Sequence, residues 1–386
     1  MTITSPTAFR AAQSVQRVTA ASRRVQQPQS SGDLVSLAMG EPDFATPLQV
    51  VEAAATALRA GRTHYSPLYG EPALRSALAD RIGALADRSI DTNDILVTHG
   101  GTGGLTAAIL AIVDPGDRVV IPDPTYSLYA DLISMAGGIV VPVPLQPDLH
   151  WDLDALDVAL VGAKLFIFCN PGNPTGIVHS RAELERLGAA LEGTDTIVIS
   201  DEAYADLTFT GEAFTSTLEV SSLVDRTVYC QTFSKSYAMT GWRVGYLWGP
   251  NAIIAAAARV HNTANGSMNT AVQDAALVAL ESCADDIARM RDAYGRRRAL
   301  MADGLATVPG LDVSSPEGAF YLFPRYDLDI PSVEIVARLR DAGVAVRPGS
   351  EFGAAGEHHL RLSYAASDDA IKAGVARLAT AFGALR

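Results

Sequence analysis

The stretch 232-TFSKSYAMTGWRVG-245 is the most informative segment of this 386-residue chain. It places Lys235 between two serines and puts Arg243 eight positions later. A single lysine would say little, because most lysines are solvated surface charges. Here a potentially nucleophilic amine is accompanied by the hydroxyls of Thr232 and Ser234 and by a guanidinium that can bind an anion with two nitrogens. The segment therefore indicates a site of covalent catalysis next to an anion-binding site.

Two upstream segments carry side chains suited to the same site. Asp201 follows the apolar run 196–200, so we expect it at the carboxyl end of a strand, where α/β sheets bind ligands; a helix N-cap is the structural alternative. Tyr204, three residues later, is either a ligand-binding phenol or a core tyrosine. Asn173 lies in the turn 173-NPTG-176, where its amide either contacts a ligand or forms an Asx turn.

A glycine-rich loop, 100-GGTGG-104, follows the apolar run 95–98 and opens a helical pattern. Backbone N–H groups at the start of that helix would face outward, where the helix dipole favours a phosphate. Glycine loops after strands are common, so a purely structural turn remains an alternative. Tyr126 follows the turn 122-PDPT-125 and is either an aromatic lid on a planar ring or a core residue.

Arg361 alternates with Leu360 and Leu362 in a short apolar segment near the C-terminus. On a strand it points to the face opposite the two leucines. It is therefore either a surface charge or an inward-facing fork for a substrate carboxylate.

The composition excludes several other classes of protein. A net charge of -13 argues against nucleic acid or an anionic membrane as the main partner. Three cysteines in so long a chain do not make a disulfide framework, which fits a reducing cytoplasm. No segment has the roughly 18–20 apolar residues that span a bilayer. Residues 1–33 lack an apolar core typical of a secretory signal; their arginines allow a transit peptide, but an N-terminal arm reaching a partner subunit is the preferred interpretation.

The spacing of apolar runs predicts an α/β fold. Near-continuous apolar runs alternate with helical patterns, as expected of parallel strands buried on both faces. We expect a large domain over residues 46–285 with a mostly parallel seven-stranded sheet flanked by helices, and a smaller α+β domain formed by residues 1–45 and 286–386. Ser180 and Glu183 predict a capping box at the start of one of the flanking helices. The seven predicted strands are 95–98, 118–122, 139–143, 164–168, 196–200, 227–231 and 244–248.

Taken together, these segments supply the groups that a pyridoxal phosphate enzyme needs, and the chain resembles the class I/II aminotransferases of fold type I. The likeness runs from 39-MGEPDF-44 to 361-RLSYA-365, with the motifs in family order. By that resemblance Lys235 forms the Schiff base with the cofactor and moves the substrate proton, and Asp201 holds the pyridinium nitrogen. The other implied contacts are Asn173 and Tyr204 to the ring oxygen, Tyr126 stacked on the ring, Gly101, Thr102, Thr232, Ser234 and Arg243 to the phosphate, and Arg361, Asn173 and Gly40 to the substrate carboxylate.

The resemblance also implies a homodimer and raises a question about the substrate. Tyr65, in 64-HYSPLYG-70, matches a tyrosine that reaches the phosphate from the partner subunit. Aspartate aminotransferases of the nearest subgroup have a lysine where this chain has Thr102, and the segment 261–267, where other relatives carry an arginine, has no cation beyond a histidine. Arg347 is either a substitute for the missing lysine or arginine or an arginine at the rim of the site. We expect a neutral or aromatic L-amino acid as the preferred donor.

The expected activity is thus transfer of an amino group between an L-amino acid and a 2-oxo acid, in the cytoplasm and without a metal. One alternative is an enzyme that has the same residues but catalyses β-elimination, ring closure or oxidation instead. A rival outside enzymes is an effector-binding regulator of the same fold. Such regulators carry a basic DNA-binding domain ahead of the fold, and only about 35 residues precede it here.

Overall fold

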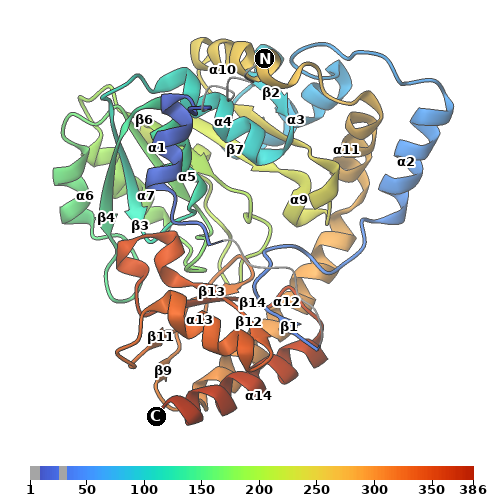
Figure 1. Ribbon diagram of the computed structural model, residues 1–386. Helices are drawn as coiled ribbons and strands as arrows, with labels where there is room; N and C mark the ends of the chain where they lie inside the picture. Colours follow the sequence, from blue (N-terminus) through green and yellow to red (C-terminus); the bar gives the residue numbers. More distant parts are fainter. Residues whose placement is uncertain (1–8, 26–32) are drawn as a thin grey trace, which may run out of the picture.

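A seven-stranded sheet forms the centre of the upper part of the molecule (Figure 1). This computed structural model describes residues 9–25 and 33–386. The strand order is β2-β8-β7-β6-β5-β3-β4, and only β8 runs against the others, so the predicted mostly parallel sheet is confirmed. The strands are β2 (Ile95–Thr98), β3 (Arg118–Asp123), β4 (Ile139–Pro144), β5 (Leu165–Cys169), β6 (Ile197–Asp201), β7 (Thr227–Thr232) and β8 (Gly245–Trp248).

Helices cover both faces of this sheet, which explains the continuous apolar runs. Along β5, Leu165 and Ile167 join one apolar cluster, whereas Phe166 and Phe168 join another on the opposite face. The first face is covered by α4 (Gly100–Ile112), α5 (Leu128–Ala136) and α10 (Asn251–Asn265). The second is covered by α3 (Pro72–Ala86), α6 (Leu153–Leu160), α7 (Arg181–Ala190), α8 (Ser221–Val224) and α11 (Thr270–Ser282), with α2 (Leu48–Arg59) packed on α11. Because both sides are buried, no strand in the middle of the sheet needs a polar face.

The lower part of the molecule is built from very short strands and three helices (Figure 1). β1 (Val35–Ser36) pairs with β12 (Val344–Ala345), and β14 (Leu360–Ser363) lies between β10 (Tyr321–Leu322) and β13 (Arg347–Pro348). A third small sheet pairs β9 (Leu311–Asp312) with β11 (Arg325–Tyr326). The helices are α12 (Ala284–Ala306), α13 (Ser332–Asp341) and α14 (Asp368–Leu385). α12 extends from the upper part to the lower part, and the expected boundary at residues 285 and 286 falls in its first turn.

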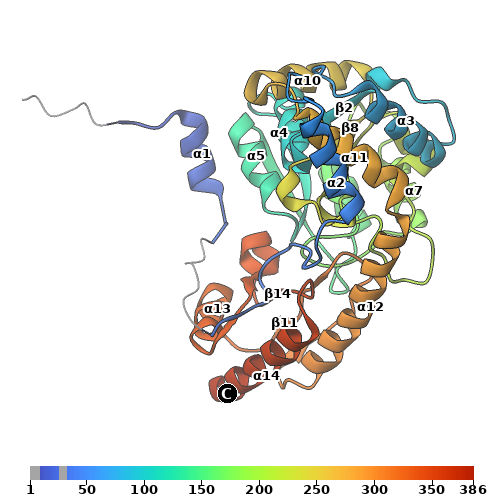
Figure 2. The ribbon, with the colours of Figure 1, turned by 90° about the vertical axis from the view of Figure 1, so that its right-hand side faces the viewer.

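The N-terminal helix α1 (Gln13–Ala21) lies against α5 at the side of the molecule (Figure 2). Arg17 donates hydrogen bonds to the carbonyl oxygens of Ser134 and Met135, at 2.9 and 3.0 Å. Part of the segment 1–33 discussed above, namely residues 1–8 and 26–32, falls outside the described residues. Within the described ranges, no helix is both long enough and apolar enough to cross a membrane.

The first residues of α7 and α4 can be compared with what the sequence predicted. Ser180 caps α7, and Glu183 returns a bond to the Ser180 backbone, so the predicted capping box is present. α4 begins at Gly100, and the glycines therefore form its first turn rather than a loop before it. That start brings the free N–H groups of α4 directly to the carboxyl edge of the sheet.

Candidate active site

One cavity of about 480 Å³ lies at the carboxyl ends of the central strands and reaches the lower part of the molecule. It is within the size range of small-molecule sites. All the site residues expected from the sequence line this cavity, except Tyr65. These lining residues are Gly40, Gly101, Thr102, Tyr126, Asn173, Asp201, Tyr204, Thr232, Ser234, Lys235, Arg243 and Arg361.

Lys235 lies on α9 (Phe233–Ser236), the single turn that follows β7. Its Nζ donates a 2.6 Å hydrogen bond to the carbonyl oxygen of Gly40. Burial, and after it the positive charge of Arg361, lowers the pKa of Lys235 to about 8. The chain has two other lysines, Lys164 and Lys372, and both are exposed on the surface. Lys235 is therefore the one lysine that faces the cavity, and its lowered pKa makes its free amine more abundant than that of an ordinary lysine.

Asp201 is buried at the last position of β6. Its Oδ2 accepts a 2.8 Å hydrogen bond from the hydroxyl of Tyr129, and its Oδ1 accepts a longer one, 3.3 Å, from the backbone of Ala203. In register, Cys169 and Cys230 stand beside it on the neighbouring strands, and both thiols are neutral because burial raises their pKa values. Burial raises the pKa of Asp201 to about 6. A carboxylate in this position is stabilised by a cation placed within the cavity.

The start of α4 forms an anion cradle with Arg243 and two hydroxyl groups. A Cβ on Gly100 would lie 2.5 Å from a nitrogen of Arg243, so only glycine lets the guanidinium approach the helix start this closely. The hydroxyl of Thr232 lies 2.9 Å from that of Ser234. The free N–H groups of α4, its dipole and the guanidinium all favour negative charge at one place.

Arg361 is buried, only 8% exposed, and carries a charge that the protein does not neutralise. It donates to Asn173 Oδ1 at 3.0 Å and to the carbonyl oxygen of Ala38 at 2.8 Å, and no carboxylate of the described residues forms an ion pair with it. Its Nε has no partner in the described part of the chain. A buried and unpaired guanidinium is costly unless an anion binds it, so the geometry favours a carboxylate ligand. The interpretation of Arg361 as a surface charge is wrong.

Tyr321, on β10, is a cavity residue that the sequence did not reveal. Its hydroxyl lies 2.8 Å from that of Tyr204, and its ring stacks under the Arg361 guanidinium, 4.4 Å from ring centroid to Cζ. A Cβ on Gly40 would approach the Tyr321 hydroxyl to 2.0 Å, which explains the glycine. The sequence also did not reveal that the Tyr129 hydroxyl bonds Asp201. Both hydroxyls act across elements far apart in sequence, and no local pattern indicates such contacts.

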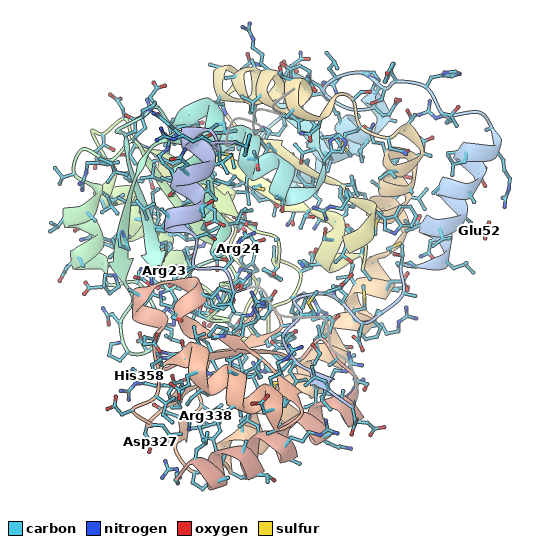
Figure 3. The ribbon with its side chains drawn as sticks, in the orientation of Figure 1. Arg23, Arg24, Glu52, Asp327, Arg338 and His358 are labelled. Atoms are coloured by element: carbon cyan, nitrogen blue, oxygen red, sulfur yellow. The ribbon has the colours of Figure 1, made fainter. Side chains whose placement is uncertain are left out.

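The outer end of the cavity contains two arginines that are already paired with acids. Arg347 stands opposite Arg361 in the β13–β14 register and forms an ion pair with Glu351. Arg24, between α1 and the lower part of the molecule (Figure 3), bonds Asp131 at 3.1 Å. Like charges directly opposite on neighbouring strands repel, and the Glu351 carboxylate offsets this repulsion.

Tyr65 lies apart from the cavity and is 96% exposed. It lines a separate depression formed with residues of the segment before α11. Within a single chain Tyr65 contributes nothing to the site. Its exposed phenol is free to contact another molecule.

Comparisons with known proteins agree with this geometry. The family profile of the class I and II aminotransferases matches residues 32–378. The aspartate/prephenate aminotransferase of Thermus thermophilus is 38% identical over 358 residues, covering 91% of each chain. A mutant structure of the Thermus thermophilus aspartate aminotransferase superposes with a TM-score of 0.87 at 37% identity, covering 95% of this chain and 98% of that one. The aromatic aminotransferase of Pyrococcus horikoshii gives a TM-score of 0.88 at 33% identity with the same coverage. With its lysine, carboxylate, anion cradle and buried arginine around one cavity, this chain belongs to the class I and II aminotransferases, which depend on pyridoxal phosphate.

Proposed function

We propose that this aminotransferase prefers a neutral or aromatic L-amino acid as donor and accepts a 2-oxo acid, in a cytoplasmic homodimer. The observation that carries the substrate preference is the ion pairing of Arg24 and Arg347. Both arginines at the outer end of the cavity already have acidic partners, so among the described residues neither is an unpaired cation that could bind a second carboxylate. The three free, buried cysteines support the cytoplasmic location.

The residues present fit pyridoxal phosphate. Its phosphate suits the cradle of Gly101, Thr232, Ser234 and Arg243. Its ring nitrogen suits Asp201, whose pKa is raised by burial and which forms no ion pair with any described residue. Since Asn173 Oδ1 already accepts from Arg361, its amide N–H group is left to donate to the ring oxygen, beside the hydroxyl of Tyr204. When bound, the cofactor supplies an aldehyde that condenses with amines and a ring that delocalises an electron pair.

The chain's own residues then have separable tasks. Arg361 binds the substrate α-carboxylate with its unpaired edge and so orients the Cα–H bond. Between turnovers, Lys235 binds the cofactor covalently. During a turnover, its amine removes the proton from the substrate Cα. Its lowered pKa makes the free amine available near neutral pH, as a general base requires. Tyr126 and Thr102 line the cavity where the ring and the phosphate are proposed to lie.

The substrate preference is tested by comparing kcat/KM for aspartate with the values for alanine, leucine, methionine and phenylalanine. Aspartate should be the poorer donor, because its side-chain carboxylate has to displace Glu351 or Asp131 from an existing pair, and a buried unpaired carboxylate is costly. If aspartate is preferred by more than tenfold, the substrate proposal is wrong while membership of the family stands. Arg347→Ala and Arg24→Ala would then identify which arginine binds the second carboxylate.

The dimer proposal rests on Tyr65, whose exposed side chain is expected to reach the phosphate cradle of the partner subunit. Sedimentation at assay concentration should show a dimer, and Tyr65→Phe should weaken cofactor binding by removing one hydrogen bond to the phosphate, worth about 1.5–3 kcal/mol for a charged acceptor. Lys372→Ala, an exposed position on α14, is the control and should bind the cofactor normally. A fully active monomer would refute the role given to Tyr65.

A further inference from the structure

A cluster of two histidines and one glutamate lies outside the active-site cavity. Both His150 and His179 place Nδ1 beside the same atom, Glu183 Oε1, at 2.9 and 3.1 Å. One ligand atom from each residue lies within 4.8 Å of the others. In a tetrahedral zinc site with bonds of about 2.0–2.1 Å, neighbouring ligand atoms are about 3.3 Å apart. Two of the three spacings, 2.9 and 3.1 Å, are close to that distance, and the third is no more than 4.8 Å.

The surroundings hold the three side chains in place. Glu183 Oε2 accepts hydrogen bonds from the backbone and the hydroxyl of Ser180, both 2.8 Å, which leaves Oε1 facing the imidazoles. The His179 ring stacks on Trp151 with 3.6 Å between centroids. Its backbone is bonded to the side chain of Asn170, with the His179 N–H 3.0 Å from Oδ1. In protein metal sites, the side chains that bind the ion are typically held in place by hydrogen bonds to neighbouring groups.

The solvent exposure of the cluster and the types of its ligand atoms suit a divalent cation that binds both nitrogen and oxygen ligands. His150 is 28% exposed, so an ion can enter from solvent, whereas His179 is only 7% exposed. His179 Nδ1 and His150 Nδ1 both face the same carboxylate oxygen, so one ion could contact all three groups. Two imidazoles and one carboxylate are ligands that Zn²⁺ accepts, with water in a fourth position.

We propose that His150, His179 and Glu183 bind a zinc-type divalent cation that braces the segment between β5 and α7. This segment carries Asn173, and His179 and Glu183 stand at its end, where α7 begins. The cation would thus stabilise the protein at a distance from the reaction, in addition to the aminotransferase activity.

The test uses the tag-free holoenzyme, stripped with a chelator and dialysed against a small excess of ZnSO₄. Elemental analysis should find about one zinc per chain, and zinc should raise the melting temperature, since it binds the folded state. Glu183→Gln, which preserves the capping box, and His150→Ala, at a partly exposed position, should each weaken zinc binding at least 100-fold. X-ray absorption should report two imidazole nitrogens among the ligands.

The control is His358→Asn, a histidine in the lower part of the molecule (Figure 3) at a left-handed backbone position that asparagine tolerates. It should bind zinc like the unmodified chain. The proposal is overturned if the unmodified holoenzyme retains no zinc after dialysis. It is equally overturned if Glu183→Gln and His150→Ala retain as much zinc as the control, which would place the ion elsewhere.

Discussion

Replacing Lys235 with alanine is expected to abolish transamination while leaving the fold and the phosphate cradle intact. The cavity has one lysine, and its Nζ lies against the Gly40 carbonyl with a pKa lowered to about 8. Loss of a positioned proton-transfer group alone costs about 10²–10⁴ in rate, and Lys235→Ala also removes the nucleophile. The measurement is the single-turnover absorbance change on mixing cofactor-loaded protein with an amino acid donor.

Borohydride reduction followed by peptide mapping provides an independent check. The reduced cofactor should be found on the peptide that contains Lys235, and only there. The matched controls are Lys164→Ala and Lys372→Ala, which remove the two exposed lysines and should transaminate normally. An adduct on Lys164 or Lys372 in the unmodified protein would contradict the assignment. So would a Lys235→Ala variant that turns over at a near-native rate.

The side chains whose positions could be predicted from the sequence are those that follow a strand end or a strand period. Asp201 follows a buried apolar run, and the strand β6 ends on it. Arg361 alternates with two leucines, and the structure buries it beside Asn173. In each case a period of two or a strand end determines the face or edge on which the side chain lies, whereas its burial in the cavity depends on the tertiary structure.

The parts that were not predicted depend on contacts between distant segments. β1 and β13 have two residues each, and both strands exist only because a distant strand pairs with them. Tyr129 reaches Asp201 from the first turn of α5, and Tyr321 reaches Tyr204 from the lower part of the molecule. Tyrosines of this kind read as core residues in the sequence, because the hydroxyl partner lies 72 or 117 positions away.

Asp201→Asn is expected to slow the half-reaction by several powers of ten. At about 4 Å and an effective dielectric constant of 20, a carboxylate and a pyridinium attract each other by roughly 4 kcal/mol, and each 1.36 kcal/mol is a factor of ten in rate. Without its charge, residue 201 would no longer stabilise a proton on the ring nitrogen, and the electron-accepting role of the ring would be weakened. Tyr129→Phe is the graded control, since it removes the 2.8 Å bond to Asp201 Oδ2 but keeps the charge. Its rate loss should be much smaller.

A stability measurement separates this catalytic role from damage to the fold. Burial raises the pKa of Asp201 to about 6 in the folded protein without cofactor, from an ordinary value of 3.8. The folded state therefore binds more protons than the unfolded state between these values, and stability falls as the pH rises through that window. Asp201→Asn removes the buried charge, so the cofactor-free variant should be more stable than the unmodified protein at pH 7.5, by at most roughly 3 kcal/mol. The difference should shrink toward pH 4. The measurement is urea unfolding at both pH values. In the activity assay, an Asp201→Asn variant that turns over normally would show that Asp201 serves only to bond Ala203 and Tyr129.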